Sequence, residues 1–192
     1  MRLLVCAGGT GGGVYPALAV LEQLNADFSD VDALWVGAEG GMEAGLVSQA
    51  GMQFESIPAA GVHGVGLKTL PGNLFKLLGG FFAARKILRR FHPDVMFFTG
   101  GYVAVPMALA GLNIPTALFV PDIEPGLALK TLTRFADRIA VSTQDSLAFF
   151  TGNQGVRGTG YPVRRELPNW DREAAYKALE LHADWPTLLV FG

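Results

Sequence analysis

The most constraining feature of the sequence is a run of glycines close to its N-terminus, where every residue of Gly8–Gly13 except Thr10 is glycine. The run follows the apolar stretch Leu3–Val5 and precedes the helical pattern Ala17–Leu21, which gives the order strand, glycine turn, helix. Glycine permits tight turns and lets a ligand approach the backbone, and a helix start offers unpaired N–H groups to an anion. The run predicts a phosphate-binding turn; a tight turn without a ligand is the alternative.

Composition narrows the class of protein. The chain has 192 residues, half of them hydrophobic, which is enough for one well-buried domain with residues left over. A net charge of −2 argues against non-specific nucleic-acid binding. The single cysteine, Cys6, fits a reducing compartment and is expected to be a small core residue. No run of about 18 apolar residues occurs, so no membrane-spanning segment is predicted.

Short apolar runs alternate with helical patterns. Strands are expected at Leu3–Cys6, Ala33–Val36, Phe54–Ile57, Val95–Phe98, Thr116–Val120, Arg138–Val141 and Val156–Gly158. Helices are expected at Tyr15–Asn25, Met42–Ala50, Asn73–Phe91, Val103–Leu112, Gly126–Ala136 and Asp145–Phe150. This alternation predicts the α/β class, with a Rossmann-like parallel sheet and helices on both faces.

Three loops marked by glycine or proline follow expected strands: Gly8–Gly13, Thr99–Tyr102 and Pro121–Gly126. In an open parallel sheet, ligands bind outside the carboxyl ends of the strands. We therefore expect the three loops to converge on one site.

The character of the chain changes after residue 163. Residues 1–163 are expected to form the Rossmann-like domain, and residues 164–192 a linker and the first strand of a second domain. This last part is polar, has one helical pattern at Asp171–Leu181, and ends on the apolar run Thr187–Gly192, which predicts that strand.

The glycine run does not match two common nucleotide-binding fingerprints. In the G-x-G-x-x-G pattern the third glycine would be Val14 or Pro16, depending on the register. A P-loop needs a lysine after its glycines, and none follows here. Cysteine and histidine residues do not have metal-ligand spacing. We predict neither a cofactor nor a metal.

The stretch Gly8–Ala19 resembles the first glycine loop of the MurG-like enzymes of glycosyltransferase family 28. Further matching segments follow in the same order along nearly the whole chain: Gly66–Leu70, Ala84–Leu88, Phe91–Val95, Gly100–Val103, Pro125–Leu127, Arg134–Arg138 and Thr159–Arg164. The resemblance implies the N-terminal, acceptor-binding half of a two-domain GT-B glycosyltransferase. Such an enzyme moves N-acetylglucosamine, with inversion, from a UDP-sugar to the lipid-diphosphate acceptor lipid I in peptidoglycan synthesis.

The same resemblance implies a protein of the cytoplasm that lies peripherally on the inner face of the cell membrane. The acceptor would bind the domain present here, and the UDP-sugar donor mainly the second domain.

The chain departs from the family pattern at three places. Gly13 stands where the family has a histidine, Phe119–Asp122 stand where it has His-Glu-Gln-Asn, and Tyr161 replaces an asparagine. These departures leave two alternatives open. One is a family 28 relative that glycosylates a different lipid acceptor, and the other is a non-catalytic protein that binds lipid head groups.

Candidate substrate-binding residues come from the matched loops: Thr10, Gly11, Gly12, Gly13, Gly100, Gly101, Tyr102, Asp122 and Arg164. An inverting transfer needs a base, and Asp122 is the candidate, with an N-cap of the helix near Pro125 as its alternative role. Arg164 could bind a diphosphate bidentately or be a solvated linker residue. Tyr102 could instead only pack on a helix.

The expected helix Asn73–Phe91 has more apolar surface than one core face needs. Beside the core stripe runs a second stripe, followed by basic residues; together these are Leu74, Phe75, Leu78, Phe81, Phe82, Arg85, Lys86 and Arg89. Exposed aromatic residues beside basic ones suit the surface of an anionic bilayer. The sequence predicts a membrane-facing helix, the alternative being that both stripes belong to the core.

Overall fold

The computed structural model describes residues 1–61, 69–151, 155–165, 167, 171–182, 184–188 and 190. The first three residues of the matched segment Gly66–Leu70 lie outside this part of the chain.

Seven parallel strands form one sheet in the order β3-β2-β1-β4-β5-β6-β7. The strands are β1 (Arg2–Cys6), β2 (Asp32–Ala38), β3 (Gln53–Ile57), β4 (Val95–Phe98), β5 (Thr116–Val120), β6 (Arg138–Val141) and β7 (Val156–Gly158). The predicted Rossmann-like sheet is confirmed. The direction of strand addition reverses between β1 and β4, and such a switch point is where open sheets bind ligands.

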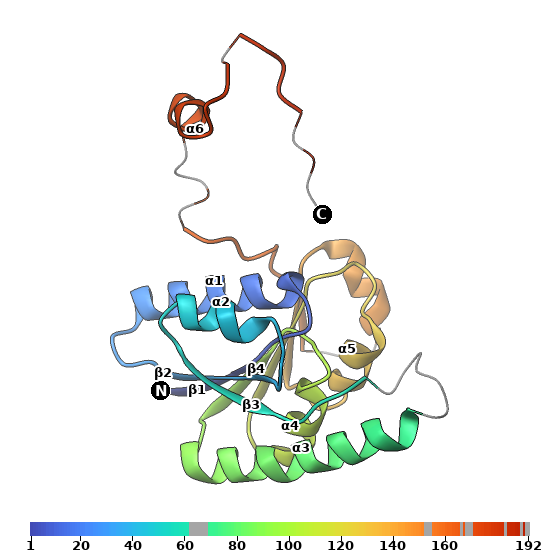
Figure 1. Ribbon diagram of the computed structural model, residues 1–192. Helices are drawn as coiled ribbons and strands as arrows, with labels where there is room; N and C mark the ends of the chain where they lie inside the picture. Colours follow the sequence, from blue (N-terminus) through green and yellow to red (C-terminus); the bar gives the residue numbers. More distant parts are fainter. Residues whose placement is uncertain are drawn as a thin grey trace.

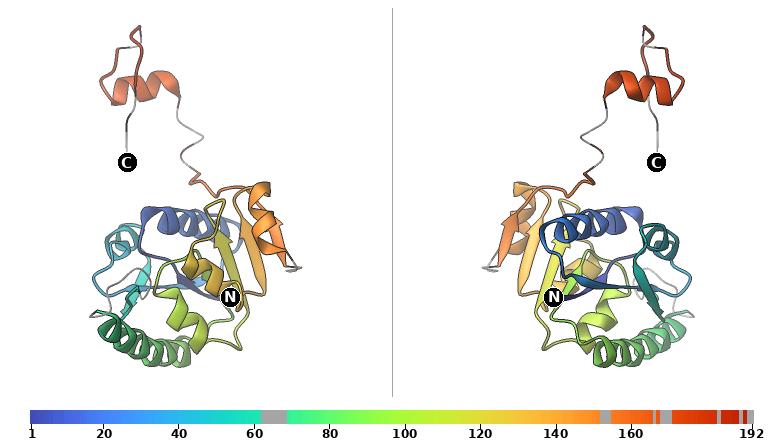
Figure 2. Two further views of the ribbon diagram at one scale, coloured as in Figure 1. Left: turned by 90° about the vertical axis from the view of Figure 1, so that its right-hand side faces the viewer. Right: turned by 90° about the vertical axis from the view of Figure 1, so that its left-hand side faces the viewer.

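Helices cover both faces of the sheet (Figures 1 and 2). One face carries α1 (Gly11–Asp27) and α2 (Glu43–Gln49), and the other carries α3 (Leu70–Phe91), α4 (Ala104–Ala110) and α5 (Leu127–Leu132). The 3₁₀ helix η1 (Gln144–Phe150) lies between β6 and β7 in sequence. The helix α6 (Arg172–Ala178) stands apart from the sheet.

The sheet separates two hydrophobic cores because successive side chains of a strand point to opposite faces. From β1, Leu4 and Cys6 join the core under α3, α4 and α5, while Leu3 and Val5 join the core under α1 and α2. Since both faces are covered, the central strand β4 is apolar throughout.

The helix that follows the glycine run begins earlier than predicted. The helix α1 starts at Gly11, not at Tyr15, so the last three glycines form its first turn and Pro16 lies inside it. The first four N–H groups of a helix need no acceptor within it, which allows the loop to wind directly into the helix. The helix α5 is also shorter than the predicted Gly126–Ala136.

The expected strand Thr187–Gly192 is not found in its described residues. Thr187, Leu188 and Val190 are not in a strand, and the other three residues lie outside the described part. A strand exists only beside a partner strand, and the described part of the chain places none there. Within that part, no helix is both long enough and apolar enough to cross a bilayer.

Candidate functional site

A cleft of about 500 Å³ lies at the switch point of the sheet, where β1, β4 and β5 end. Its walls come from all three loops singled out in the sequence, as predicted. The lining residues are Gly8, Gly9, Thr10, Gly12, Gly13, Thr99, Gly100, Gly101, Tyr102, Pro121, Asp122, Gly126, Leu127, Ala128 and Leu129. The described structure thus brings together the predicted substrate-binding residues except Gly11, which starts α1 between two of them, and Arg164.

The two glycine turns in this glycine cleft touch each other through their backbones. A Cβ placed on Gly101 would lie 2.8 Å from the carbonyl oxygen of Gly8. Gly101 also has a φ of +90°, and Gly9 has a φ of +87°. Only glycine fits these positions without strain, so the floor of the cleft is made of backbone atoms.

The start of α1 supplies donors to the cleft. Its N-cap, Thr10, has extended backbone and no side-chain cap bond, while the N–H groups of Gly13 and Val14 both bond the Thr10 carbonyl, at 3.1 and 3.3 Å. The N–H groups of Gly11 and Gly12 have no acceptor inside the helix. This turn can therefore bind an anion or a sugar hydroxyl.

Thr99, a buried residue directly after β4, holds the same turn in place. Its hydroxyl donates to the Gly13 carbonyl oxygen at 2.7 Å. Thr99 was expected only as the start of a converging loop, and the structure shows that its side chain supports the cleft.

Pro16 explains an unusual contact made by the loop. Proline has no N–H, so the carbonyl of Gly12, four residues earlier, loses its helical partner. The hydroxyl of Tyr161 donates to this oxygen at 3.4 Å instead. Tyr161 follows β7, so this bond ties the far edge of the sheet to the glycine loop.

Tyr161 packs against an aromatic ring and is influenced by the charge of a carboxylate. Its ring meets that of Phe119 edge to face, with centroids 5.9 Å apart. Partial burial raises the pKa of Tyr161, and the nearby charge of Asp122 raises it further. The hydroxyl therefore keeps its proton at neutral pH and acts as a donor.

Asp122 lines the cleft and does not cap α5, whose N-cap is Gly126 without a side-chain bond. The Asp122 loop is held from β6 and η1. The hydroxyl of Ser142 donates to the Pro121 carbonyl at 2.8 Å, and that of Ser146 to the Asp122 carbonyl at 3.4 Å. The carboxylate thus stays available to a ligand.

Tyr102 is half exposed on the rim of the cleft. A Cβ placed on Gly61 would lie 2.7 Å from its ring, so the ring lies against the backbone of Gly61.

Arg164 is not brought to the cleft. Its guanidinium lies 5.3 Å from the ring centroid of Tyr15, beside a separate hollow of about 540 Å³ between α1 and α2. Next to it, Arg165 bonds the side chains of Glu22 and Gln23. The chain that leaves the sheet is fastened along α1.

Glu43 is a further residue at the cleft that the sequence did not reveal. Its side chain is fully buried and accepts hydrogen bonds from the N–H groups of Ala38, at 2.8 Å, and Gly9, at 3.4 Å. The only signal in the sequence is an acidic residue just after Gly40-Gly41, where an exposed helix start is the simpler expectation.

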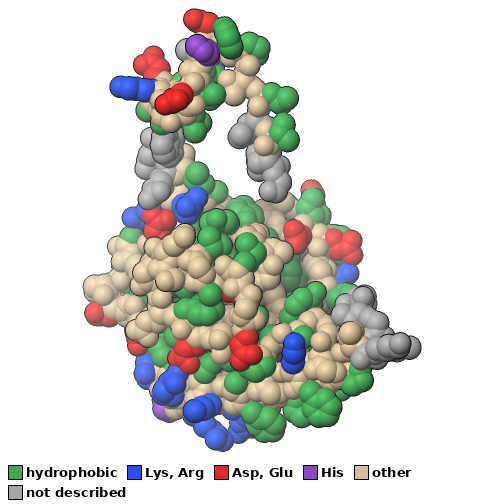
Figure 3. Space-filling view, in the orientation of Figure 1, with side chains coloured by type: hydrophobic (Ala, Val, Ile, Leu, Met, Phe, Trp, Pro, Cys, Tyr) green, Lys and Arg blue, Asp and Glu red, His purple; other side chains and the backbone are tan. Residues whose placement is uncertain are grey.

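The helix α3 leaves its second stripe outside the core, so the alternative that both stripes are core is wrong. Phe75 is 75 % exposed, Phe82 is 63 % exposed, and Leu74 and Leu78 are also exposed. Figure 3 shows hydrophobic side chains along part of the lower edge of the molecule and Lys and Arg side chains along the rest.

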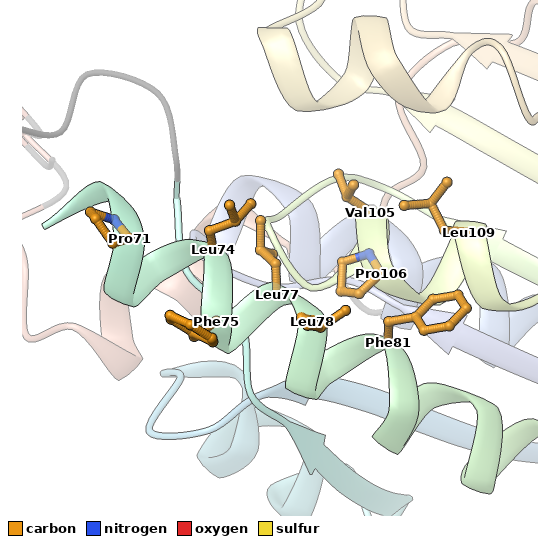
Figure 4. Close-up of a pocket in the computed structure, with 9 residues that line it drawn as sticks. All are labelled: Pro71, Leu74, Phe75, Leu77, Leu78, Phe81, Val105, Pro106 and Leu109. Atoms are coloured by element: carbon orange, nitrogen blue, oxygen red, sulfur yellow. The ribbon is translucent and has the colours of Figure 1, made fainter. Parts of the chain in front are cut away.

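This stripe forms one wall of an apolar groove of about 640 Å³ between α3 and α4 (Figure 4). The residues that line the α3–α4 groove are Pro71, Leu74, Phe75, Leu77, Leu78, Phe81, Val105, Pro106 and Leu109. A smaller hollow among Phe82, Arg85, Lys86 and Arg89 lies along the same helix.

Cys6 is a buried core residue. Among the described residues, no three His, Cys, Asp or Glu side chains are grouped closely enough to hold a metal ion. Burial, and to a smaller extent Glu43, raises the pKa of the Cys6 thiol well above its usual value. The thiol is thus a core group.

Comparison with known proteins agrees with the Rossmann-like sheet. Residues 3–141 match the glycosyltransferase family 28 N-terminal domain. A crystal structure of MurG from Acinetobacter baumannii superposes with a TM-score of 0.65 at 30 % identity, over 75 % of this chain and 42 % of that one. UDP-GlcNAc 2-epimerase from Methanocaldococcus jannaschii shares the fold, with a TM-score of 0.59 at 12 % identity over 84 % of this chain and 46 % of that one.

Two relatives carry the name UDP-N-acetylglucosamine--N-acetylmuramyl-(pentapeptide) pyrophosphoryl-undecaprenol N-acetylglucosamine transferase. The protein from Desulforamulus reducens is 38 % identical and that from Desulfitobacterium hafniense strain Y51 is 40 % identical, each over the whole of this chain. The chain spans about half the length of these relatives, 52 % and 53 %. By its sequence and its fold, the chain belongs to glycosyltransferase family 28.

Proposed function

We propose that this chain is the acceptor-binding half of an enzyme that transfers N-acetylglucosamine from a UDP-sugar to a lipid-linked diphosphate, lipid I, in peptidoglycan synthesis. The observation that carries the proposal is the glycine cleft, whose backbone floor and α1 start lie at the switch point of a family 28 domain. The names of the relatives supply the substrates.

In this proposal residues 1–163 bind the acceptor, and residues 164–192 lead into the domain that binds most of the UDP-sugar. The acceptor diphosphate accepts hydrogen bonds from the N–H groups at the start of α1. Gly100, Gly101 and Tyr102 line the same cleft.

Asp122 is the candidate base. Its carboxylate takes the proton of the acceptor hydroxyl while that oxygen bonds to the anomeric carbon of the donor sugar. The bond from this carbon to the UDP oxygen breaks, UDP leaves with the electron pair, and the configuration inverts.

Replacing Asp122 with Asn in the full-length protein tests this role. We expect kcat to fall about a hundredfold, because a positioned base contributes at least that factor, and the acidic limb of the pH profile to disappear. Asp145→Asn is the matched control, because Asp145 is an exposed residue of η1. Near-normal turnover with an unchanged pH profile would show that Asp122 is not the base.

We further propose that α3 places the protein on the inner face of the cell membrane. Four exposed apolar side chains and three neighbouring basic ones, Arg85, Lys86 and Arg89, support this placement. Aromatic residues insert at the level of the lipid head groups while Lys and Arg attract anionic lipids.

The whole function is tested by complementation of a strain depleted of its own enzyme, and by transfer from UDP-N-acetylglucosamine to lipid I in vitro. Rescue and transfer are expected. Transfer to another lipid acceptor, but not to lipid I, would assign the protein to a relative with different specificity. Absence of turnover with every UDP-sugar would favour a head-group-binding protein.

A further inference from the structure

Glu43 is a buried carboxylate to which the transfer reaction assigns no role. It is the first residue of α2, and its side chain is 0 % exposed. In the described part of the chain it forms no ion pair. A buried charge is costly unless hydrogen bonds satisfy it, so its donors show what it holds in place.

The donors come from two different loops. The Oε1 atom accepts from the N–H of Ala38, the last residue of β2, and the Oε2 atom accepts from the N–H of Gly9 in the glycine loop. Glu43 therefore links the end of β2 to the loop that follows β1.

Three glycines leave the space that this side chain occupies. A Cβ on Gly8, Gly37 or Gly41 would lie 2.4 to 2.7 Å from atoms of Glu43. These glycines belong to the loop after β1, to β2 and to the β2–α2 connection. Glycine is thus needed at three positions around the Glu43 side chain. A buried acid without a structural role would not require three neighbouring glycines.

We propose that Glu43 is a positioning residue of the glycine cleft, one that locks the Gly8–Gly9 turn and occupies the Gly9 N–H so that the acceptor diphosphate is directed to the start of α1. The proposal deepens the proposed function and rests on it for the identity of the ligand. The negative charge of Glu43 disfavours a second anion beside Gly9, while the N–H groups of Gly11 and Gly12 remain available.

The test uses Glu43→Gln in the full-length protein, because an amide keeps the shape but presents an NH₂ group to one of the two N–H donors. We expect the acceptor KM to rise about tenfold, the donor KM to stay within twofold, and deuterium uptake to increase in the peptide spanning residues 7–14. Asp137→Asn is the matched control. Asp137 also accepts a hydrogen bond from a backbone N–H, that of Thr116 at 2.8 Å, but at the amino ends of the strands, away from the glycine cleft.

Gly41→Ala provides a second variant should the amide variant fold poorly. Its Cβ would lie 2.4 Å from Glu43 Oε1 and displace the carboxylate without removing its charge. The same rise in acceptor KM and in loop uptake is expected. An unchanged acceptor KM and unchanged loop uptake in the folded variants, or changes equal to those of Asp137→Asn, would overturn the proposal.

The proposed transferase function and the positioning role of Glu43 can be refuted independently of each other. A wild-type protein without transferase activity contradicts the proposed function, whereas the uptake of the glycine loop still decides whether Glu43 positions it.

Discussion

The glycine cleft and the α3–α4 groove are hollows of similar size that differ in their lining, because only the cleft is lined by two glycine turns. The cleft, about 500 Å³, has a floor of backbone atoms from two glycine turns, whereas the groove, about 640 Å³, is walled by apolar side chains of two helices. Backbone donors recognise a ligand by hydrogen bonds in fixed directions, while aliphatic and aromatic side chains recognise apolar surface without fixed direction.

Because of this difference, the two regions are sensitive to different kinds of substitution. The cleft is damaged by adding atoms, because its glycines leave no room for a Cβ. The groove is damaged by removing apolar atoms, and its exposed side chains contribute little to the fold.

The largest effect is expected from Gly101→Ala. The new Cβ would lie 2.8 Å from the Gly8 carbonyl oxygen, at a φ of +90°. Strain and overpacking together should lower the free energy of unfolding by about 3 kcal/mol, or roughly 10 °C in Tm for a chain of this length. Calorimetry measures this loss.

Gly45→Ala is the control, since a Cβ on Gly45, inside α2, has no atom within 4 Å. It should be neutral or stabilising by up to about 1 kcal/mol. Equal losses in both variants would mean that the contact between the two glycine turns is not what makes the cleft intolerant.

An intermediate effect is expected from the double change Phe75→Ser and Phe82→Ser. Binding to anionic vesicles should weaken about tenfold or more, because burying a phenylalanine is worth about 1.5–3 kcal/mol. Tm should stay nearly unchanged, since both side chains are mostly exposed. Vesicle co-sedimentation and thermal unfolding measure the two quantities.

Phe28→Ser is the matched control for this pair, because Phe28 is also exposed but follows α1 on the other face of the sheet. Vesicle binding that survives the double change, or that falls equally in the control, would refute a membrane-facing α3.

The smallest effect is expected from Tyr161→Phe, which removes the 3.4 Å bond to the Gly12 carbonyl. The pKa of Tyr161 is raised in the fold, so the native state holds this proton more tightly than the unfolded chain, whose tyrosines ionise near pH 10. The stability contribution is therefore full below about pH 10 and is lost as the pH rises further. Between pH 9 and 11 the variant should lose less stability than the wild type in urea unfolding.

Absorbance near 295 nm gives an independent check. Tyr161→Phe should remove amplitude from the high-pH part of the tyrosinate titration. Tyr176→Phe should remove it from the low-pH part, because hydrogen bonds from Thr187 and Arg172 lower the pKa of Tyr176. Loss of low-pH amplitude in Tyr161→Phe would contradict the placement of its hydroxyl beside Asp122.

Much of the fold could be predicted because its signals are local. Apolar runs bounded by glycine or proline located all seven strands to within a few residues, and the order of strands and helices predicted a parallel sheet. The start of α1 was misplaced because glycines and Pro16 normally end a helical pattern. Here the Gly12 carbonyl, which loses its helical partner because of Pro16, accepts from the Tyr161 hydroxyl instead.

Part of the candidate site could also be predicted from local signals in the sequence. The glycine turns and Asp122 follow strands directly, so the topology of a parallel sheet brings them together. Arg164 lies outside the lining of the cleft, and nothing in the sequence shows that its guanidinium stacks on Tyr15.

The parallel sheet, the three converging loops and the surplus apolar stripe of α3 could be predicted from the sequence, because each depends on spacing along the chain. Only the tertiary structure decided that Tyr161 reaches Gly12 from 149 residues away and that Glu43 is buried beneath the loop. Both contacts join segments that are distant in sequence, and their geometry exists only after the sheet has brought the carboxyl ends of its strands side by side.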